Sequence, residues 1–151
     1  MVYAIDPGPE KSAWVYLDGE YNPPVVKDFG FEFNGEIEMW SKTPVAIEMI
    51  ESYGMAVGAE VFRTCVEIGR FVQRCGGEKW VTLIGRKAVK LNLCGSARAK
   101  DANIRQAIID RYGGPAAIRK GGPLYKVSSH IWAALAVGLT YLDQQKTGGT
   151  L

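Results

Sequence analysis

The feature that most constrains the fold is a change of pattern about a third of the way along the chain. Three strand-like apolar segments, 2–6, 12–17 and 25–33, follow one another with only the turn motifs PGP, DG and NPP between them. Links this short join antiparallel strands. Beyond residue 43, strand-like runs alternate with stretches of helical periodicity, a pattern that favours parallel strands connected by helices. We therefore expect a mixed sheet.

The remaining elements follow from the same patterns. The run PVAIEMI is too apolar to alternate, which is typical of a central strand covered on both faces. The expected elements are strands 44–50 and 79–84, a weak short helix 35–42, helices 58–73, 86–95 and 101–112, a last helix from 128 or 129 to about 144, and a loop 113–126 rich in Gly, Pro and basic residues. With right-handed crossovers they form an α/β fold, a five-stranded mixed sheet with three antiparallel strands, then parallel strands, and helices on both faces.

Length and composition exclude several classes of protein. A chain of 151 residues with 47% hydrophobic content suits a single domain, 1–144, followed by a disordered tail, 145–151. The longest apolar stretches are about ten residues, short of the roughly 20 that a membrane span needs, and no secretory signal pattern is present. Three cysteines without a CxxC pair and a single histidine argue against a disulfide framework or a zinc site. We expect no membrane association and a cytoplasmic location.

Charge is divided unevenly along the chain. The net charge is only +2, but the first 60 residues carry 11 acidic and 3 basic side chains, whereas residues 61–151 carry 5 acidic and 15 basic ones. Such a division predicts a cation-binding site beside an anion-binding surface.

Two carboxylates are notable for their positions in strands. Asp6 ends the first strand, where ligand sites of open α/β sheets gather, although a strand-end aspartate also commonly caps a turn. Glu48 interrupts the most apolar run, where an unpaired buried carboxylate costs several kcal/mol. Either a buried Lys or Arg or a shared divalent metal could compensate it. If the two strands are neighbours, Asp6 and Glu48 lie side by side as hard oxygen ligands for Mg²⁺.

Three residues near predicted helix starts are further candidates. His130 is the only histidine, and a neutral imidazole at the start of the last helix could ligate a metal or deprotonate a water, although a lone histidine is often structural. Lys100 could reach a scissile phosphate as a point charge. Asp101 suits a helix N-cap as well as an acidic site residue.

The helix 58–73 has an unusually wide apolar face. The stripe through Val61 and Ile68 is widened by Phe62, Val66 and Gly69. A face of this width is typical of a deeply packed helix, and it is also how a homodimer interface is patterned.

Three segments together carry a family resemblance. AIDPG in the first strand, AIE in the fourth and HIWAALAVGLTYL in the last helix have the order and spacing found in RuvC-type Holliday junction resolvases of the RNase H-like superfamily. Over residues 2–142 the chain resembles in particular the short resolvase-like proteins of phages and prophages. The resemblance implies an RNase H-like nuclease domain, a homodimer, two Mg²⁺ or Mn²⁺ ions per active site, and phosphodiester hydrolysis in four-way junctions or other branched DNA.

Site residues follow from the resemblance position by position. Asp6 matches the first catalytic aspartate, Glu48 the catalytic glutamate, and His130 the first ligand of the last helix, so these three are the expected metal ligands. Lys100 and Asp101 lie where related resolvases place an active-site lysine beside an acidic or amide residue.

One position departs from the family pattern. Ala133 falls where a second acidic ligand is expected in the last helix. Glu51, Asp101 or Asp143 could compensate its loss. Three functions therefore stay open: a junction endonuclease, a branched-DNA-binding protein without catalysis, and an RNase H-like nuclease acting on flaps, forks or hybrids.

The expected DNA contacts come from one loop and from the basic second half. Tyr53 and Met55 lie in the segment that corresponds to the family's stacking loop, and stacking on an unpaired base is worth about 1–3 kcal/mol. The basic candidates for phosphate contacts are Arg86, Lys87, Lys90, Arg98, Arg105, Arg119 and Lys120.

Overall fold

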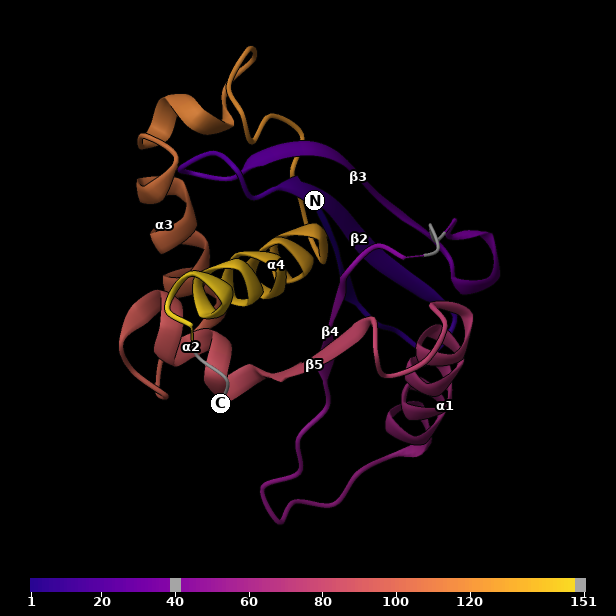
Figure 1. Ribbon diagram of the computed structural model, residues 1–151. Helices are drawn as coiled ribbons and strands as arrows, with labels where there is room; N and C mark the ends of the chain where they lie inside the picture. Colours follow the sequence, from indigo (N-terminus) through magenta and orange to yellow (C-terminus); the bar gives the residue numbers. More distant parts are fainter. Residues whose placement is uncertain (39–41, 149–151) are drawn as a thin grey trace.

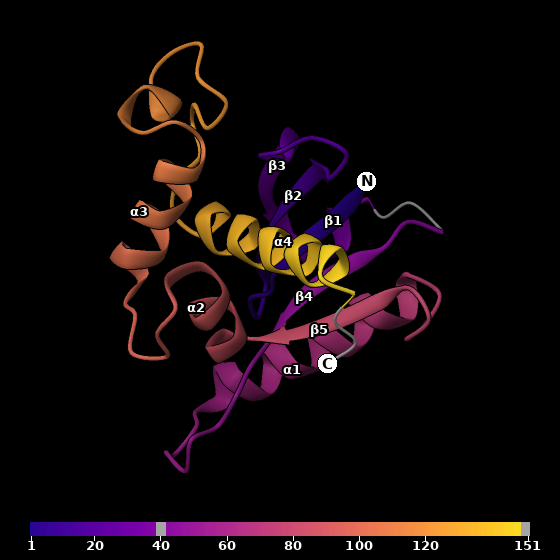
Figure 2. The same ribbon diagram turned by 60° about the vertical axis from the view of Figure 1, so that its left-hand side comes forward.

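The computed structural model describes residues 1–38 and 42–148, and in this part of the chain the strands form one five-stranded sheet. The strand order is β3-β2-β1-β4-β5, with the first strand at the centre. Figure 1 shows the whole fold, and Figure 2 labels all five strands. The strands are β1 (Val2–Asp6), β2 (Lys11–Asp18), β3 (Val25–Phe33), β4 (Val45–Met49) and β5 (Val81–Gly85). The helices are α1 (Ala59–Arg74), α2 (Arg86–Cys94), α3 (Asp101–Arg111) and α4 (Ile131–Lys146), with 3₁₀ turns at Asn34–Glu36 and Pro115–Ile118.

The pairing of the strands confirms the predicted mixed sheet. β1 pairs antiparallel with β2, and β2 pairs antiparallel with β3. β1 pairs parallel with β4, and β4 pairs parallel with β5. In the parallel register Ile5 lies opposite Ile47, so the next residues, Asp6 and Glu48, stand at the same level of adjacent strands.

Helices cover both faces of the sheet, as predicted. Side chains alternate between the faces of a strand. Val2 and Ala4 of β1 therefore pack in the core built with α2, α3 and α4, whereas Tyr3 and Ile5 pack in the core built with α1. Figure 2 shows α4 and α1 on opposite sides of the strands.

Helix α4 lies close against the middle of the sheet because Gly138 has no side chain. A Cβ atom at this position would be 2.6 Å from Leu17 Cδ1 and 3.0 Å from Ala4 Cβ. The close approach brings the start of α4, with His130 just before it, to the carboxyl end of β1.

The weak helix predicted over 35–42 is wrong over most of its described part. Only Asn34–Glu36 forms a 3₁₀ turn, and Ile37 is extended, with φ −69° and ψ 115°. Ile37 is 3% exposed because its side chain joins the core under α1, which holds the chain in an extended path. Residues 39–41 of the predicted helix lie outside the described residues.

The last helix differs from its prediction at both ends. It begins at Ile131 rather than at 128 or 129, and it continues to Lys146, two residues into the segment predicted as a disordered tail. No glycine or proline lies between Gly138 and Gly148, and Gly148 has a positive φ of 64°. Residues 149–151 of the predicted tail lie outside the described residues. Among the described residues no helix combines the length and apolarity that crossing a membrane requires.

Candidate active site

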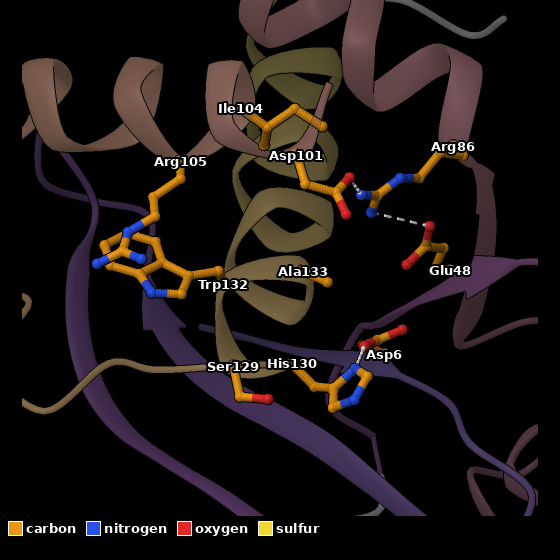
Figure 3. Close-up of a pocket in the computed structure, with 10 residues that line it drawn as sticks. All are labelled: Asp6, Glu48, Arg86, Asp101, Ile104, Arg105, Ser129, His130, Trp132 and Ala133. Carbon is orange, nitrogen blue, oxygen red and sulfur yellow. Dashed lines mark hydrogen bonds and ion pairs between the residues drawn. The ribbon is translucent and has the colours of Figure 1, made fainter. Parts of the chain in front are cut away.

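A pocket of about 370 Å³ lies at the carboxyl ends of β1 and β4, where the sheet meets the starts of α2, α3 and α4 (Figure 3). It gathers residues from five separate segments of the chain. The lining residues are Asp6, Glu48, Arg86, Asp101, Ile104, Arg105, Ser129, His130, Trp132 and Ala133. The pocket thus unites four of the predicted catalytic residues, Asp6, Glu48, Asp101 and His130.

The turn after Asp6 is held by a small buried network. The Gly8 backbone N–H donates to Ser12 Oγ at 3.0 Å, and the Ser12 hydroxyl donates to Asn34 Oδ1 at 2.6 Å. The Asn34 amide in turn donates to the Gly8 carbonyl at 3.0 Å. These bonds satisfy the polar groups of the turn, so the strand-end position of Asp6 is fixed.

His130 closes one side of the pocket. Its Nδ1 lies 3.1 Å from Asp6 Oδ2, and its ring stacks on Phe31 of β3 with the ring centroids 5.6 Å apart. Ser129 has a φ of 49°, an unusual conformation for a residue with a Cβ, and it turns the chain into α4 directly before His130. Packing and backbone together aim the imidazole at Asp6.

Glu48 and Asp101 share one cation, Arg86. The Arg86 Nη1 atom lies 3.3 Å from Glu48 Oε1, and Nη2 pairs with the carboxylate of Asp101. Arg86 reaches both because it begins α2 directly after β5, and Gly85 of β5 lies opposite Met49 in the register with β4. Arg86 therefore belongs to the carboxylate cluster, whereas the sequence placed it among surface phosphate contacts.

Asp6 and Glu48 form a partly buried pair of carboxylates with too little positive charge nearby. Their side chains are 17% and 13% exposed. Burial, and then the charge of Asp6, raise the pKa of Glu48 to about 7 against the opposing effect of Arg86. Burial also raises the pKa of Asp6, although Glu48 and His130 act in the opposite direction. The pair is a place where a bound cation would relieve unfavourable electrostatics.

The donor set suits one hard cation better than two. Asp6 and Glu48 present neighbouring carboxylate oxygens, the ligands that Mg²⁺ and Mn²⁺ prefer. Within the part of the chain that the structure describes, no three His, Cys, Asp or Glu side chains converge on one metal position. His130 Nδ1 faces Asp6, so the imidazole acts in this arrangement as a hydrogen-bond partner of the Asp6 carboxylate.

The structure discriminates among the three residues that could compensate for Ala133. Asp143 is held by Arg111, with both oxygens at 2.8 Å, and by Asn92. Glu51 Oε1 accepts the Lys87 backbone N–H at 3.3 Å and packs on Gly85 outside the pocket. Only Asp101 lines the pocket with Ala133.

Asp101 is not the helix cap that its position suggested. Lys100 is the N-cap residue of α3, and Asp101 is the first residue inside the helix. The Lys100 side chain is exposed and is absent from the pocket lining, while its backbone N–H donates to Asn103 Oδ1 at 2.9 Å.

The other predicted DNA contacts lie outside the pocket, with one exception. Tyr53 and Met55 are 64% and 77% exposed on the segment between β4 and α1, which extends away from the body of the domain (Figure 1). Arg105 is the exception, because it lines the pocket. Of the others, Lys87, Arg98, Arg119 and Lys120 are exposed and Lys90 is half-buried.

Sequence reasoning missed Trp132. Its indole lies under the Arg105 guanidinium, whose Cζ is 4.9 Å from the ring centroid (Figure 3). The Trp132 Nε1 atom is buried without a hydrogen-bond partner among the described residues. An aromatic residue in an apolar helix carries no signal of this role, because the pairing with Arg105 depends on how α3 and α4 pack.

Comparison with solved structures identifies the architecture. A structure of Thermus thermophilus RuvC superposes with a TM-score of 0.64 over 97% of this chain and 96% of that chain, at 19% sequence identity. The chain has the fold of RuvC. A second structure, of T. thermophilus RuvC in complex with a Holliday junction substrate, gives a TM-score of 0.63 at 18% identity, covering 97% of this chain and 95% of that chain. No protein-family model and no curated protein matches this sequence, so the likeness to RuvC is one of fold.

Proposed function

We propose that this protein is a metal-dependent, structure-specific DNA endonuclease that resolves Holliday junctions or other branched DNA. The observation that carries the proposal is the partly buried Asp6–Glu48 pair at the carboxyl ends of adjacent parallel strands, with His130 beside it, in a domain with the RuvC fold. The second RuvC structure holds a Holliday junction substrate, which supports branched DNA as the substrate class.

The site residues divide the chemistry among them. Mg²⁺ or Mn²⁺, when bound, supplies activation of water and stabilisation of charge on the phosphate. Asp6 and Glu48 would hold the ion, and His130 would orient Asp6 through Nδ1 while its other ring nitrogen, Nε2, accepts a proton from water. In the hydrolysis a water oxygen bonds to phosphorus, the bond to the 3′ oxygen breaks, and that oxygen leaves with a proton. The products carry a 5′-phosphate and a 3′-hydroxyl.

The Arg105–Trp132 pair supports a phosphate contact next to the site. Arg105 has no ion-pair partner among the described residues, and stacking on the indole restrains its guanidinium at the pocket. A restrained arginine can bind a backbone phosphate of the bound strand with little further ordering. Tyr53 and Met55, exposed on their protruding segment, are proposed to contact the unpaired bases at the branch point.

The proposed assembly is a homodimer, since two symmetric cuts in a four-way junction need two sites related by a two-fold axis. Phe62 and Val66 on α1 are 63% and 56% exposed, and they leave apolar surface for a second copy. Sedimentation velocity tests this directly. The dimer is expected for the unmodified chain and a monomer for Phe62→Asp, whereas a monomeric unmodified chain would contradict the assembly.

Cleavage of a labelled four-way junction in Mg²⁺ or Mn²⁺ tests the activity. Asp6→Asn and Glu48→Gln are expected to abolish cleavage while leaving junction binding in place. Asp110→Asn, which removes an exposed carboxylate on α3 outside the pocket, is the matched control and should cleave normally. Absence of cleavage by the unmodified chain in either metal would overturn the proposal.

One observation favours a second candidate, a branched-DNA-binding protein without catalysis. Ala133 brings a methyl group to the pocket where an acidic ligand is expected, and Arg86 already neutralises part of the charge of Glu48. This candidate predicts tight junction binding that Asp6→Asn does not change, with no product in any metal. A panel of flaps, forks and RNA–DNA hybrids in the same assay separates junction resolution from broader nuclease activity.

A further inference from the structure

The Arg86 guanidinium is the only cation that pairs with the pocket carboxylates of Glu48 and Asp101 among the described residues. It lies between the carboxylates of Glu48 and Asp101, and its side chain is 27% exposed (Figure 3). The register between β4 and β5 sets this position, since Glu48 lies opposite Ile84, two residues before Arg86. The pairing of β5 with β4 therefore places the Arg86 guanidinium beside Glu48.

Counting the charges of the cluster shows what more it can accept. Asp6, Glu48 and Asp101 bring three negative charges when ionised, and Arg86 brings one positive charge. One divalent ion balances the remainder, whereas two would leave an excess of positive charge in a partly buried site. Arg105 does not alter this count at the carboxylates, because it is turned onto Trp132 on the other side of the pocket (Figure 3).

The ligands for a second ion are also reduced. Ala133 offers no donor atom, and it lines the pocket together with Asp101. Asp101 itself is engaged by the guanidinium of Arg86. A second metal ion on the side of the cluster away from Asp6 would need carboxylate oxygens as ligands. The Arg86 guanidinium already occupies that side.

We propose that Arg86 replaces a second divalent ion, so that each active site binds one ion, on Asp6 and Glu48. In this arrangement Arg86 orients Glu48 and Asp101 and presents a permanent positive charge to the phosphate that enters the pocket. Arg86 and Ala133 act as a matched pair, since the arginine supplies the charge and the missing carboxylate removes the competing ligand. The inference rests on the proposed metal dependence and deepens it.

The stoichiometry of Mn²⁺ binding by the full chain tests the inference without DNA or cleavage. Isothermal titration calorimetry is expected to give one Mn²⁺ per chain, and Ala133→Asp alone is expected to keep that number because Arg86 remains. The double variant Arg86→Gln/Ala133→Asp is expected to bind two, with the electron paramagnetic resonance signal of a coupled pair. Thermal unfolding of each variant verifies that it is folded.

Arg105→Gln is the matched control. It removes another arginine from the same pocket lining, but one that pairs with none of the three carboxylates, so the number of bound Mn²⁺ ions should stay at one. Asp6→Asn should weaken the binding of that ion at least tenfold.

Each contrary outcome has a distinct meaning. Two Mn²⁺ ions in the unmodified chain, or one in a folded double variant, would overturn the role of Arg86 and leave the proposed metal dependence intact. No Mn²⁺ binding by the unmodified chain would overturn the metal dependence and this inference with it.

Discussion

Helix α4 buries nearly all of its residues from Ile131 to Thr140 against one face of the sheet, whereas α1, on the opposite face, leaves Phe62 and Val66 more than half exposed. The first face carries the main core and holds the start of α4 at the end of β1. The second face has a smaller core and spare apolar surface. The two faces therefore differ in kind: one positions the pocket, and the other leaves apolar side chains exposed.

Truncation of large side chains should give the largest difference between the faces. Leu135 on α4 is fully buried, so Leu135→Ala is expected to reduce the free energy of unfolding by about 2–5 kcal/mol. Phe62→Ala on α1 removes an exposed ring and should change it by less than about 0.5 kcal/mol in the monomer. Urea denaturation at low protein concentration measures both. Equal losses of stability from the two substitutions would show that Phe62 on α1 is as well packed as Leu135 on α4.

The two mid-helix glycines provide a sharper pair. Gly138→Ala forces a Cβ against Leu17 and Ala4 and is expected to cost about 1–3 kcal/mol. Gly69→Ala on α1 meets no atom within 4 Å and replaces a poor helix former, so it should add up to about 1 kcal/mol. The opposite signs are readable as shifts of the thermal midpoint. A gain from Gly138→Ala would mean that α4 can move away from the sheet.

A pair of arginines extends the comparison to DNA. Arg105 lines the pocket, whereas Arg63 on α1 is exposed and paired with Glu10 at 3.2 Å. Arg105→Gln should weaken junction binding about tenfold and reduce the slope of log affinity against log salt by about 1. Arg63→Gln should leave that slope unchanged in the same fluorescence titration. A larger effect from Arg63 would place the DNA on the α1 face.

The smallest expected difference between the two faces is the contribution of one ion pair on each face to stability as the pH changes. Burial alone would raise the pKa of Asp143, but its hydrogen bonds with Arg111 and Asn92 lower it below its ordinary value of 3.8. A lowered folded-state pKa stabilises the fold above pH 3.8, and that contribution is lost as the pH falls through the folded-state pKa.

Asp143→Asn should therefore reduce the free energy of unfolding by about 1 kcal/mol at pH 7 and by progressively less below pH 4. Urea denaturation at a series of pH values measures this loss. Glu10→Gln, in the exposed pair with Arg63, is the control on the α1 side. It should not measurably change the free energy of unfolding at pH 7 or below pH 4. A pH-independent cost for Asp143→Asn would show that its charge is not what stabilises the contact between α3 and α4.

The fold and the Asp6–Glu48 pair were predictable because they depend on local patterns. Strand-like runs, turn motifs and a carboxylate within an apolar strand are all visible in the sequence, and parallel pairing then brings the two strand ends together. Of the two predicted ways to compensate Glu48, a cationic side chain or a metal, the structure places a half-buried arginine, Arg86, beside it. Which arginine it is could not be predicted, since it depends on β5 being the neighbour of β4.

Other parts of the site depend on tertiary contacts that leave no local signal. Trp132 looks like an ordinary core residue until α3 brings Arg105 over it. The helix predicted at 35–42 was wrong because burial of Ile37 overrides a weak helical pattern. Local propensity is least informative where a distant contact decides the outcome.

The contact between His130 and Asp6 joins residues 124 positions apart in the chain. During synthesis, β1 leaves the ribosome long before the residues that begin α4. The pocket therefore cannot assemble before the start of α4 has been made, even if the strands of the sheet have already paired. A fragment that ends before α4 lacks His130 and the α4 side of the pocket, so it cannot form the complete site.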